Sequence, residues 1–267
     1  MTEGTGQAKP GRAILLALAL LLPGPSPSVD SPPSPDPAAT LADALETVAE
    51  GNCEGVTAQL ASLAGPPLPE PLARRVNFLL GICHHRLGRY EEALLHLRAA
   101  AATFPEVADY ALFAWAESEQ RRGVPQDAIA PLARLLATYP ESPLVEPALL
   151  LLAESQATAL DLQAATLSLR EYLAQFGTSP RAPTARLLLA RVRLRAGDPS
   201  EALPLLLELW REEPGNGAGD EAAALLEALG APAAVTAADL FARARALYRN
   251  EAFSRAVEAL APFAGAP

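Results

Sequence analysis

Apolar and small residues follow the three-to-four-residue spacing of amphipathic helices along most of the chain. In residues 74–88 such positions include Phe78, Leu80 and Gly81, and the pattern ends at Gly88. In residues 89–105 one stripe contains Tyr90, Ala93, Leu94, Leu97 and Ala100. Glycine readily adopts the left-handed conformation that ends a helix, and Pro105 cannot continue one. The pattern therefore predicts two helices joined by a tight turn at Gly88.

This two-helix pattern recurs at a nearly constant spacing. The turn glycines are Gly51, Gly88, Gly123 and Gly197, and Glu251 occupies the same slot in a last copy. Small residues also recur in register, as the pairs Gly81/Ala93, Ala116/Ala128, Ala153/Ala165, Ala190/Ala202 and Ala244/Ala256. Two helix backbones approach closely only where side chains are small, so each pair predicts a helix–helix contact. A period of about 35 residues predicts a solenoid of stacked units.

The best-preserved copy resembles the tetratricopeptide repeat. Leu80-Gly81, Gly88, Tyr90, Ala93 and Pro105 match that family's pattern. The resemblance implies an all-α, right-handed superhelical solenoid of helix pairs, in which the first helix of each pair lines the concave face. We expect these repeats over residues 39–230 and a further, incomplete repeat over residues 231–267.

Three segments show a narrower resemblance to the N-terminal helical region of soluble lytic murein transglycosylases. They are "DYALFAWAESEQRRG", "LWREEPGNGAGDEAAALLEALG" and "LFARARALYRNEAFSRAVEAL". In that family an α-superhelix precedes a catalytic domain with a Glu-Ser dipeptide and a Gly-Leu-Met-Gln segment. Here Glu117-Ser118 and Glu154-Ser155 lie within predicted repeat helices, and no Gly-Leu-Met-Gln segment follows. No catalytic residue is therefore transferred, and we expect a chain that is not an enzyme.

The N-terminus is typical of an exported protein. Lys9 and Arg12 precede ten apolar residues, 13–22, a length that suits a signal peptide and is too short to cross a bilayer comfortably. We interpret residues 1–28 as a signal peptide or a retained hydrophobic segment, and residues 29–38 as a disordered Pro/Ser linker. This interpretation predicts a location in the periplasm or cell envelope, with membrane contact only through an uncleaved N-terminal segment.

The chain contains few residues that could bind a metal or cofactor or form a disulfide. Cys83, His84 and His85 are consecutive on a predicted helix, so their side chains point about 100° apart and cannot converge on one metal ion. No cofactor motif is present, so we expect neither a metal nor a cofactor. For Cys53 and Cys83, two buried thiols are favoured over a disulfide, which an exported protein permits. The net charge of −10 argues against nucleic acid as a partner.

Arginines concentrate on the predicted first helices, and acidic residues on the second ones. One interpretation is a basic concave groove with aromatic rims that binds an anionic or carboxylate-bearing partner. Its predicted residues are Arg75, Phe78, Arg86, Tyr110, Phe113, Arg121, Arg191, Arg195, Arg245 and Tyr248. The alternative is solvated faces and ion pairs between helices.

Together these patterns predict a non-catalytic scaffold of the bacterial cell envelope that binds a protein or peptide. One version is the peptidoglycan-associated helical module of a lytic transglycosylase that lacks its catalytic domain. The alternative is a tetratricopeptide adaptor in outer-membrane or envelope assembly.

Overall fold

The computed structural model describes residues 36–61, 63, 68–230 and 235–263. The predictions for residues 1–28, and for most of the Pro/Ser linker, lie outside these ranges. Every regular element in the described ranges is helical, which confirms the predicted all-α class. The elements are α2 (Pro37–Ala49), α3 (Cys53–Ala61), α4 (Glu70–Arg86), α5 (Tyr90–Thr103), η1 (Pro105–Val107), α6 (Ala108–Arg121), α7 (Pro125–Thr138), α8 (Val145–Thr158), α9 (Leu162–Phe176), α10 (Ala182–Arg195), α11 (Pro199–Glu212), α12 (Gly217–Ala228), α13 (Ala237–Arg249), α14 (Phe253–Ala259) and η3 (Ala261–Phe263).

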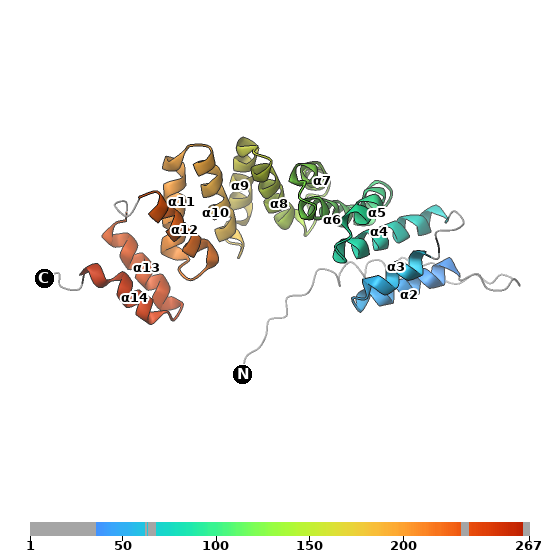
Figure 1. Ribbon diagram of the computed structural model, residues 1–267, viewed down its shortest axis with the longest axis horizontal. Helices are drawn as coiled ribbons and strands as arrows, with labels where there is room; N and C mark the ends of the chain where they lie inside the picture. Colours follow the sequence, from blue (N-terminus) through green and yellow to red (C-terminus); the bar gives the residue numbers. More distant parts are fainter. Residues whose placement is uncertain (1–35, 62, 64–67, 231–234, 264–267) are drawn as a thin grey trace, which may run out of the picture. The chain divides into compact units, whose positions relative to one another are not determined.

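The helices fall into two compact units, Met1–Val145 and Glu146–Pro267, which we call unit 1 and unit 2. In unit 1 the pairs are α2–α3, α4–α5 and α6–α7, and in each pair the two helices pack against each other (Figure 1). The second helix of a pair also packs on the first helix of the next, as α5 does on α6. Unit 2 repeats this arrangement with α10, α11 and α12. The predicted solenoid of tetratricopeptide-like helix pairs is thus confirmed.

Left-handed turn residues separate the two helices of each pair. Gly51, Gly88, Gly123 and Gly197 have φ values of 87°, 73°, 80° and 81°, as predicted. Glu251, with φ 59°, takes the same conformation in the last pair. A search for glycine missed the turn between α8 and α9, where Leu160 has φ 64° and lies midway between Gly123 and Gly197. This conformation costs a non-glycine residue about 1–2 kcal/mol.

The small residues bring the paired helices together. A Cβ atom at Gly81 would lie 2.8 Å from the Leu97 side chain and 3.1 Å from the Leu97 backbone nitrogen. Ala93 and Ala116 are fully buried, as are Ala128, Ala153, Ala165, Ala190 and Ala202. The close approach predicted from the register of these residues is confirmed.

The long step between Gly197 and Glu251 contains an additional helix. Helix α12 packs on α11 and α10, and Gly230 follows its end with φ 64°. Helix α13 then packs on α11 and on α14. Three helices, α11, α12 and α13, therefore separate the α10–α11 turn from the α13–α14 turn, whereas two helices separate the earlier turns, and this explains the 54-residue spacing.

Candidate protein-binding surface

The structure divides the predicted partner-binding residues by their exposure. Six of them are exposed, namely Arg86, Arg121, Arg191, Arg195, Arg245 and Tyr248. Tyr110 and Phe113 on α6 are half-buried, and burial raises the pKa of the Tyr110 phenol. Arg75 and Phe78 are buried, with relative solvent exposures of 6% and 1%. The exposed residues are shared between unit 1 and unit 2, and each unit is described separately below.

Phe78 and Arg75 do not belong to the predicted surface. The Phe78 ring meets Phe104 edge-on, with 6.2 Å between ring centroids and an interplanar angle of 87°. Phe78 precedes Gly81 by one helical turn, so it lies on the side of α4 that packs into the core. The sequence-based assignment of Phe78 to an aromatic rim is therefore wrong. Arg75 is also buried, so it does not belong to an exposed binding surface.

An exposed arginine recurs at one position of the first helices, two residues before the left-handed turn residue. These residues are Arg86, Arg121, Arg195 and Arg249, and all four are exposed. Each ends its helix, where the helix dipole stabilises a positive charge. Arg249 was not among the predicted binding residues, although it stands two residues before Glu251, as the other three arginines stand two residues before their turn glycines.

In unit 1 the arginine that ends a first helix occurs on α4 and α6, which contact each other. His85 of α4 contacts α6 through both ring nitrogens: Nδ1 lies 2.9 Å from the Ser118 hydroxyl and Nε2 lies 3.5 Å from the Glu117 carboxylate. Arg86 follows His85 on α4, and Arg121 lies on the last turn of α6. The two arginines therefore end neighbouring first helices, with Glu117 as a nearby acidic group.

In unit 2 several arginines pair with acidic residues of neighbouring helices. Arg191 of α10 donates to Glu221 of α12. Arg193 lies 2.9 Å from Glu201 and 3.5 Å from Asp198. Ion pairs between helices, the alternative interpretation of the arginine pattern, are therefore present alongside the exposed Arg195.

A buried carboxylate that sequence analysis missed joins α5 to α6. The Glu119 side chain has no exposed surface and accepts hydrogen bonds from Arg98 at 2.9 Å and Arg122 at 2.6 Å. The Trp115 indole N–H donates to the same carboxylate at 3.3 Å. Arg122 also donates to Glu91 of α5 at 2.6 Å. Burial of this charge is tolerated because two cations compensate it, so the network is structural.

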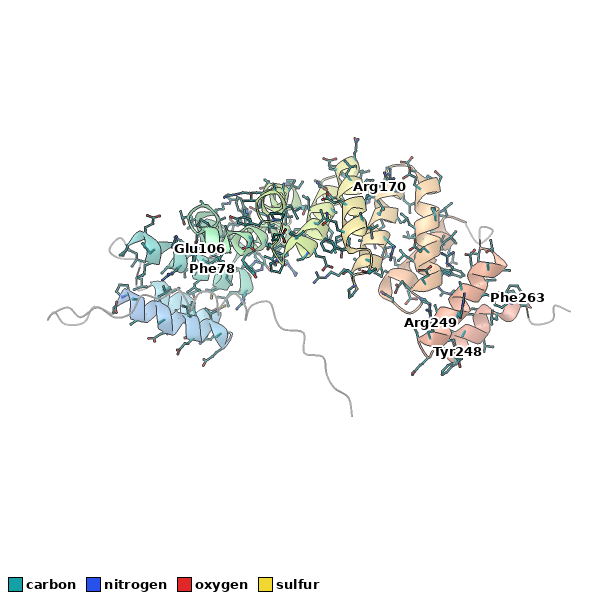
Figure 2. All side chains as sticks on the ribbon, turned by 180° about the vertical axis from the view of Figure 1, so that it is seen from behind. Phe78, Glu106, Arg170, Tyr248, Arg249 and Phe263 are labelled. Carbon is teal, nitrogen blue, oxygen red and sulfur yellow. The ribbon has the colours of Figure 1, made fainter. Side chains whose placement is uncertain are left out.

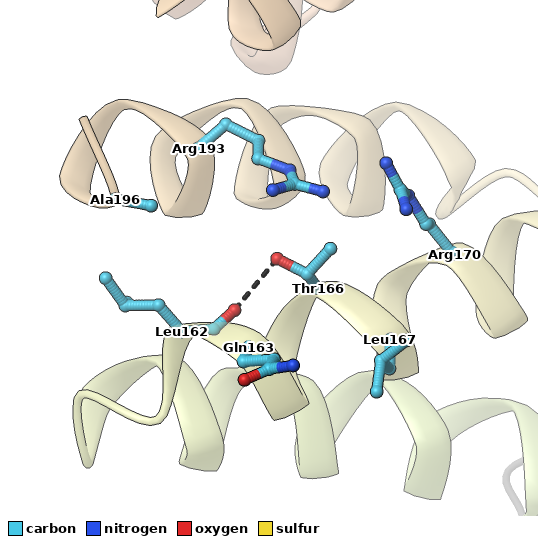
Figure 3. Close-up of a pocket in the computed structure, with 7 residues that line it drawn as sticks. All are labelled: Leu162, Gln163, Thr166, Leu167, Arg170, Arg193 and Ala196. Atoms are coloured by element: carbon cyan, nitrogen blue, oxygen red, sulfur yellow. Dashed lines mark hydrogen bonds between the residues drawn. The ribbon is translucent and has the colours of Figure 1, made fainter. Parts of the chain in front are cut away.

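A groove of about 440 Å³ lies between α9 and α10 in unit 2 (Figure 3). Arg170 of α9 and Arg193 of α10 face each other across it. Both donate to Glu201, at 3.1 Å and 2.9 Å, so their charge is partly neutralised. Leu167 on the rim is 62% exposed. This groove involves a second helix and thus differs from the predicted first-helix face.

A larger groove of about 710 Å³ lies in unit 1 between α3, α4 and α5. The rings of His84 and His96 stack along it, 5.7 Å apart and 5° from parallel. Asn77 Oδ1 lies 2.9 Å from His96 Nδ1. Burial lowers the pKa of both imidazoles, so neutral rings are favoured. In the described part of the chain, no three potential ligands among His, Cys, Asp and Glu gather as a metal site.

Cys53 and Cys83 are both buried and are not bridged. They are in hydrogen-bonding contact across the α3–α4 packing. The hydrogen bond from Cys83 lowers the pKa of Cys53 to about 6, aided by Arg86 and opposed by burial. The same contact, together with burial, raises the pKa of Cys83.

None of the helices in the described ranges is both long and apolar enough to cross a bilayer.

Comparison with known proteins agrees with the helix-pair architecture. Models of the tetratricopeptide repeat match residues 57–108, 110–142 and 150–218, which together make up more than half of the chain. The chain therefore belongs to the tetratricopeptide-repeat proteins. No curated protein matches it.

Two solved structures are similar to the chain. One contains the nearly identical TPR-like repeats of a protein from Podosopora anserina described as a kinesin light chain. It shows 18% identity and a TM-score of 0.49, and the match covers 73% of this chain and 96% of that one. The other is a thermophilic TPR protein of Thermus thermophilus, with 20% identity, a TM-score of 0.39, and coverage of 72% and 99%.

Proposed function

We propose that this protein is a non-catalytic scaffold whose first helices bind a carboxylate-rich segment of a partner protein. Tetratricopeptide repeats generally mediate protein–protein interactions, and family membership supports this class of function. The observation that supports the partner chemistry is the exposed arginine that ends four of the first helices, α4, α6, α10 and α13. Arginine suits this role because its planar guanidinium can donate two parallel hydrogen bonds to one carboxylate.

The spacing of Arg86 and Arg121 suggests how such a segment would bind in unit 1. Packed helices lie about 8–10 Å apart. A peptide in the polyproline II conformation advances about 3.1 Å per residue with three residues per turn, so side chains three residues apart lie on the same side. Two acidic side chains three residues apart would therefore match two arginines on neighbouring helices. The half-buried Tyr110 and Phe113 lie on α6 about three and two helical turns before Arg121, so a longer segment would be needed to reach them.

Fluorescence anisotropy with labelled peptides tests this proposal. The probe is an extended peptide with glutamates three residues apart, and the comparison peptide replaces them with glutamine. We expect the double variant Arg86→Ala/Arg121→Ala to lose at least about tenfold in affinity for the glutamate peptide, equivalent to about 1.4 kcal/mol. Arg134→Ala on the second helix α7 is the matched control. Equal binding of the two peptides, or unchanged affinity of the double variant, would contradict the proposal.

We further propose that the scaffold works in the bacterial cell envelope. The support is the basic and apolar N-terminal sequence, Lys9 to Leu22, which has the composition of an export signal. Cell fractionation and N-terminal sequencing of the protein from the envelope fraction would test this. Recovery of the uncleaved chain from the cytoplasm alone would exclude it.

Within the envelope, we propose a peptidoglycan-associated helical module of the lytic-transglycosylase type. The support is the sequence resemblance of the three segments that include residues 109–123, 209–230 and 240–260. Purified protein should co-sediment with isolated peptidoglycan sacculi without releasing soluble muropeptides. Failure to sediment would favour the alternative, an adaptor in outer-membrane or envelope assembly.

A further inference from the structure

The α13–α14 pair exposes residues that are buried at equivalent positions of the other pairs. Phe241 lies ten residues before the left-handed residue Glu251 and is 53% exposed. The residues ten before the other turns are Leu41, Phe78, Phe113, Leu150 and Leu187. All of these are buried except Phe113, which is half-buried. The exposure of Phe241 is therefore a departure from the repeat.

The second helix of this pair shows the same departure. Val257 lies six residues after the turn residue and is 72% exposed. Its equivalents are Thr57, Leu94, Ile129, Thr166 and Leu203, which are buried or half-buried. In the earlier pairs the next first helix packs on the second helix, as α6 does on α5 and α12 on α11. The α13–α14 pair thus presents, uncovered, the face that normally receives a helix.

Two aromatic pairs preorganise this face. Phe241 and Phe263 stack with centroids 5.0 Å apart, and Tyr248 and Phe253 meet edge-on at 5.2 Å. Phe263 lies toward one end of α13 and Tyr248 toward the other, so the pairs occupy both ends of the face (Figure 2). Val257 lies on the same side of α14 as Phe253, one helical turn later. An exposed apolar face of this kind marks an interaction site.

The charges beside the face differ between its two helices. Helix α13 carries the exposed Arg245 and Arg249, and α14 carries the exposed Arg255 and Glu258. Arg255 lies 3.4 Å from Asp220 of α12, which leaves Glu258 as the charge of α14 that faces outward. A two-fold axis that lies between the two faces and runs parallel to the helices would place α13 of one copy against α14 of the other. Arginines of each copy would then lie opposite the glutamate of the other, so the surface is complementary to itself.

A head-to-tail arrangement would place this face against α2, the first helix of the described residues. Helix α2 buries its apolar residues Leu41, Leu45 and Val48, and its exposed positions include Asp43 and Glu46. An acidic, polar helix face offers nothing for the aromatic pairs to pack against. We therefore propose that a second copy of this chain binds through α13 and α14, forming a symmetric dimer in which α13 of each copy packs on α14 of the other.

Analytical ultracentrifugation of the full chain tests the dimer. We expect a concentration-dependent monomer–dimer equilibrium, and at least about a tenfold weaker one for Val257→Glu, because a charge would be buried at the interface. Leu167→Glu, at a position of α9 that is 62% exposed against 72% for Val257, should dimerise as the unmodified chain does. Circular dichroism verifies that both variants fold. A chain that stays monomeric at all concentrations, or a Val257→Glu dimer of unchanged affinity, would overturn the proposal.

Charge reversal tests the two-fold arrangement. Arg245→Glu/Arg249→Glu should weaken the dimer by placing like charges opposite each other, and adding Glu258→Arg should restore it. Failure of the triple variant to recover would exclude this symmetry and leave another partner helix as the occupant. The peptide-binding variant Arg86→Ala/Arg121→Ala should dimerise normally, so the outcome is independent of the proposed function.

Discussion

The α4–α5 and α13–α14 pairs follow the same sequence pattern but differ in what surrounds them. At equivalent positions, Phe78 is 1% exposed and Phe241 53%, while Leu94 is 5% exposed and Val257 72%. Both pairs place small residues at the helix crossing, Gly81 in one and Ala244 in the other. The repeat pattern therefore determines where the two helices of a pair cross. Burial of the apolar residues away from that crossing depends on the neighbouring pair.

The pairs also differ in polar contacts between their helices. In α4–α5, His84 stacks on His96, and in α8–α9 the Ser168 hydroxyl donates to Gln156 at 2.8 Å. Both contacts join a residue four before the turn to one eight after it. In α13–α14 these positions are Leu247 and Ala259. The α13–α14 pair thus has two apolar residues at the positions where α4–α5 and α8–α9 form polar contacts.

The largest expected effect comes from truncating the equivalent aromatic residues. Phe78→Ala should lower the free energy of unfolding by about 3–5 kcal/mol, because it leaves a cavity in the core. Phe241→Ala, measured where the chain is monomeric, should cost only about 1 kcal/mol, because half of the ring is already exposed. Denaturant unfolding of both variants measures this difference. Similar losses would show that both faces are covered in solution.

A smaller effect is expected from the buried carboxylate of α6. Glu119→Gln should cost about 1.5–3 kcal/mol, because it removes charge-assisted hydrogen bonds from Arg98 and Arg122. Glu117→Gln is the matched control two residues away, since its only described pairing is with His85 at 3.5 Å. That control should change stability by less than about 0.5 kcal/mol. Equal effects of the two substitutions would argue against a stabilising network.

The sequence predicted the contacts within pairs better than those between them. Small residues and left-handed glycines mark a position by their own chemistry, so Gly81 and Gly88 could be assigned without a structure. Leu160 could not, because a strained residue in a glycine slot has no local signature. Glu119 depends on Arg98 from a different pair, and Phe78 turned inward because its side of α4 packs into the core. Helical periodicity does not specify how one helix registers against the next.

Exchanging the turn residues should produce opposite, smaller changes. Gly88→Ala should destabilise the chain by about 1–2 kcal/mol, because a side chain disfavours the left-handed conformation. Sterics add little, since the nearest atom to an added Cβ, the Tyr90 hydroxyl, is 4.0 Å away. Glu251→Gly should stabilise the chain by about 0.5–1 kcal/mol. This is the net of two effects: glycine relieves the backbone strain of the folded state, and it also increases the entropy of the unfolded chain. Thermal unfolding measures both variants, and a stabilising Gly88→Ala would refute the equivalence.

The smallest expected effect is a pH dependence confined to the pair that contains the histidines. All three histidines of the chain lie in α4 and α5, and burial lowers the pKa of His84 and His96. Near His84, Glu92 and Glu54 raise its pKa, while Arg89 lowers it. The folded state therefore binds protons more weakly than the unfolded state, whose histidines titrate near pH 6.5. Their contribution to stability is complete above that pH and is lost as the pH falls through the lowered values.

Hydrogen exchange, corrected for intrinsic rates, measures this effect segment by segment at about pH 7.5 and pH 5.5, on either side of the unfolded histidine pKa. Protection of α4 and α5 should fall relative to α13 and α14, which contain no histidine. His84→Gln/His96→Gln should reduce the difference, because glutamine does not titrate and its amide can still hydrogen-bond to Asn77. A double variant with the full pH dependence would assign the loss to other titratable groups of these helices. In that case the stacked imidazoles would make no separate contribution to stability. The α4–α5 and α13–α14 pairs would then differ only in how far their apolar residues are buried.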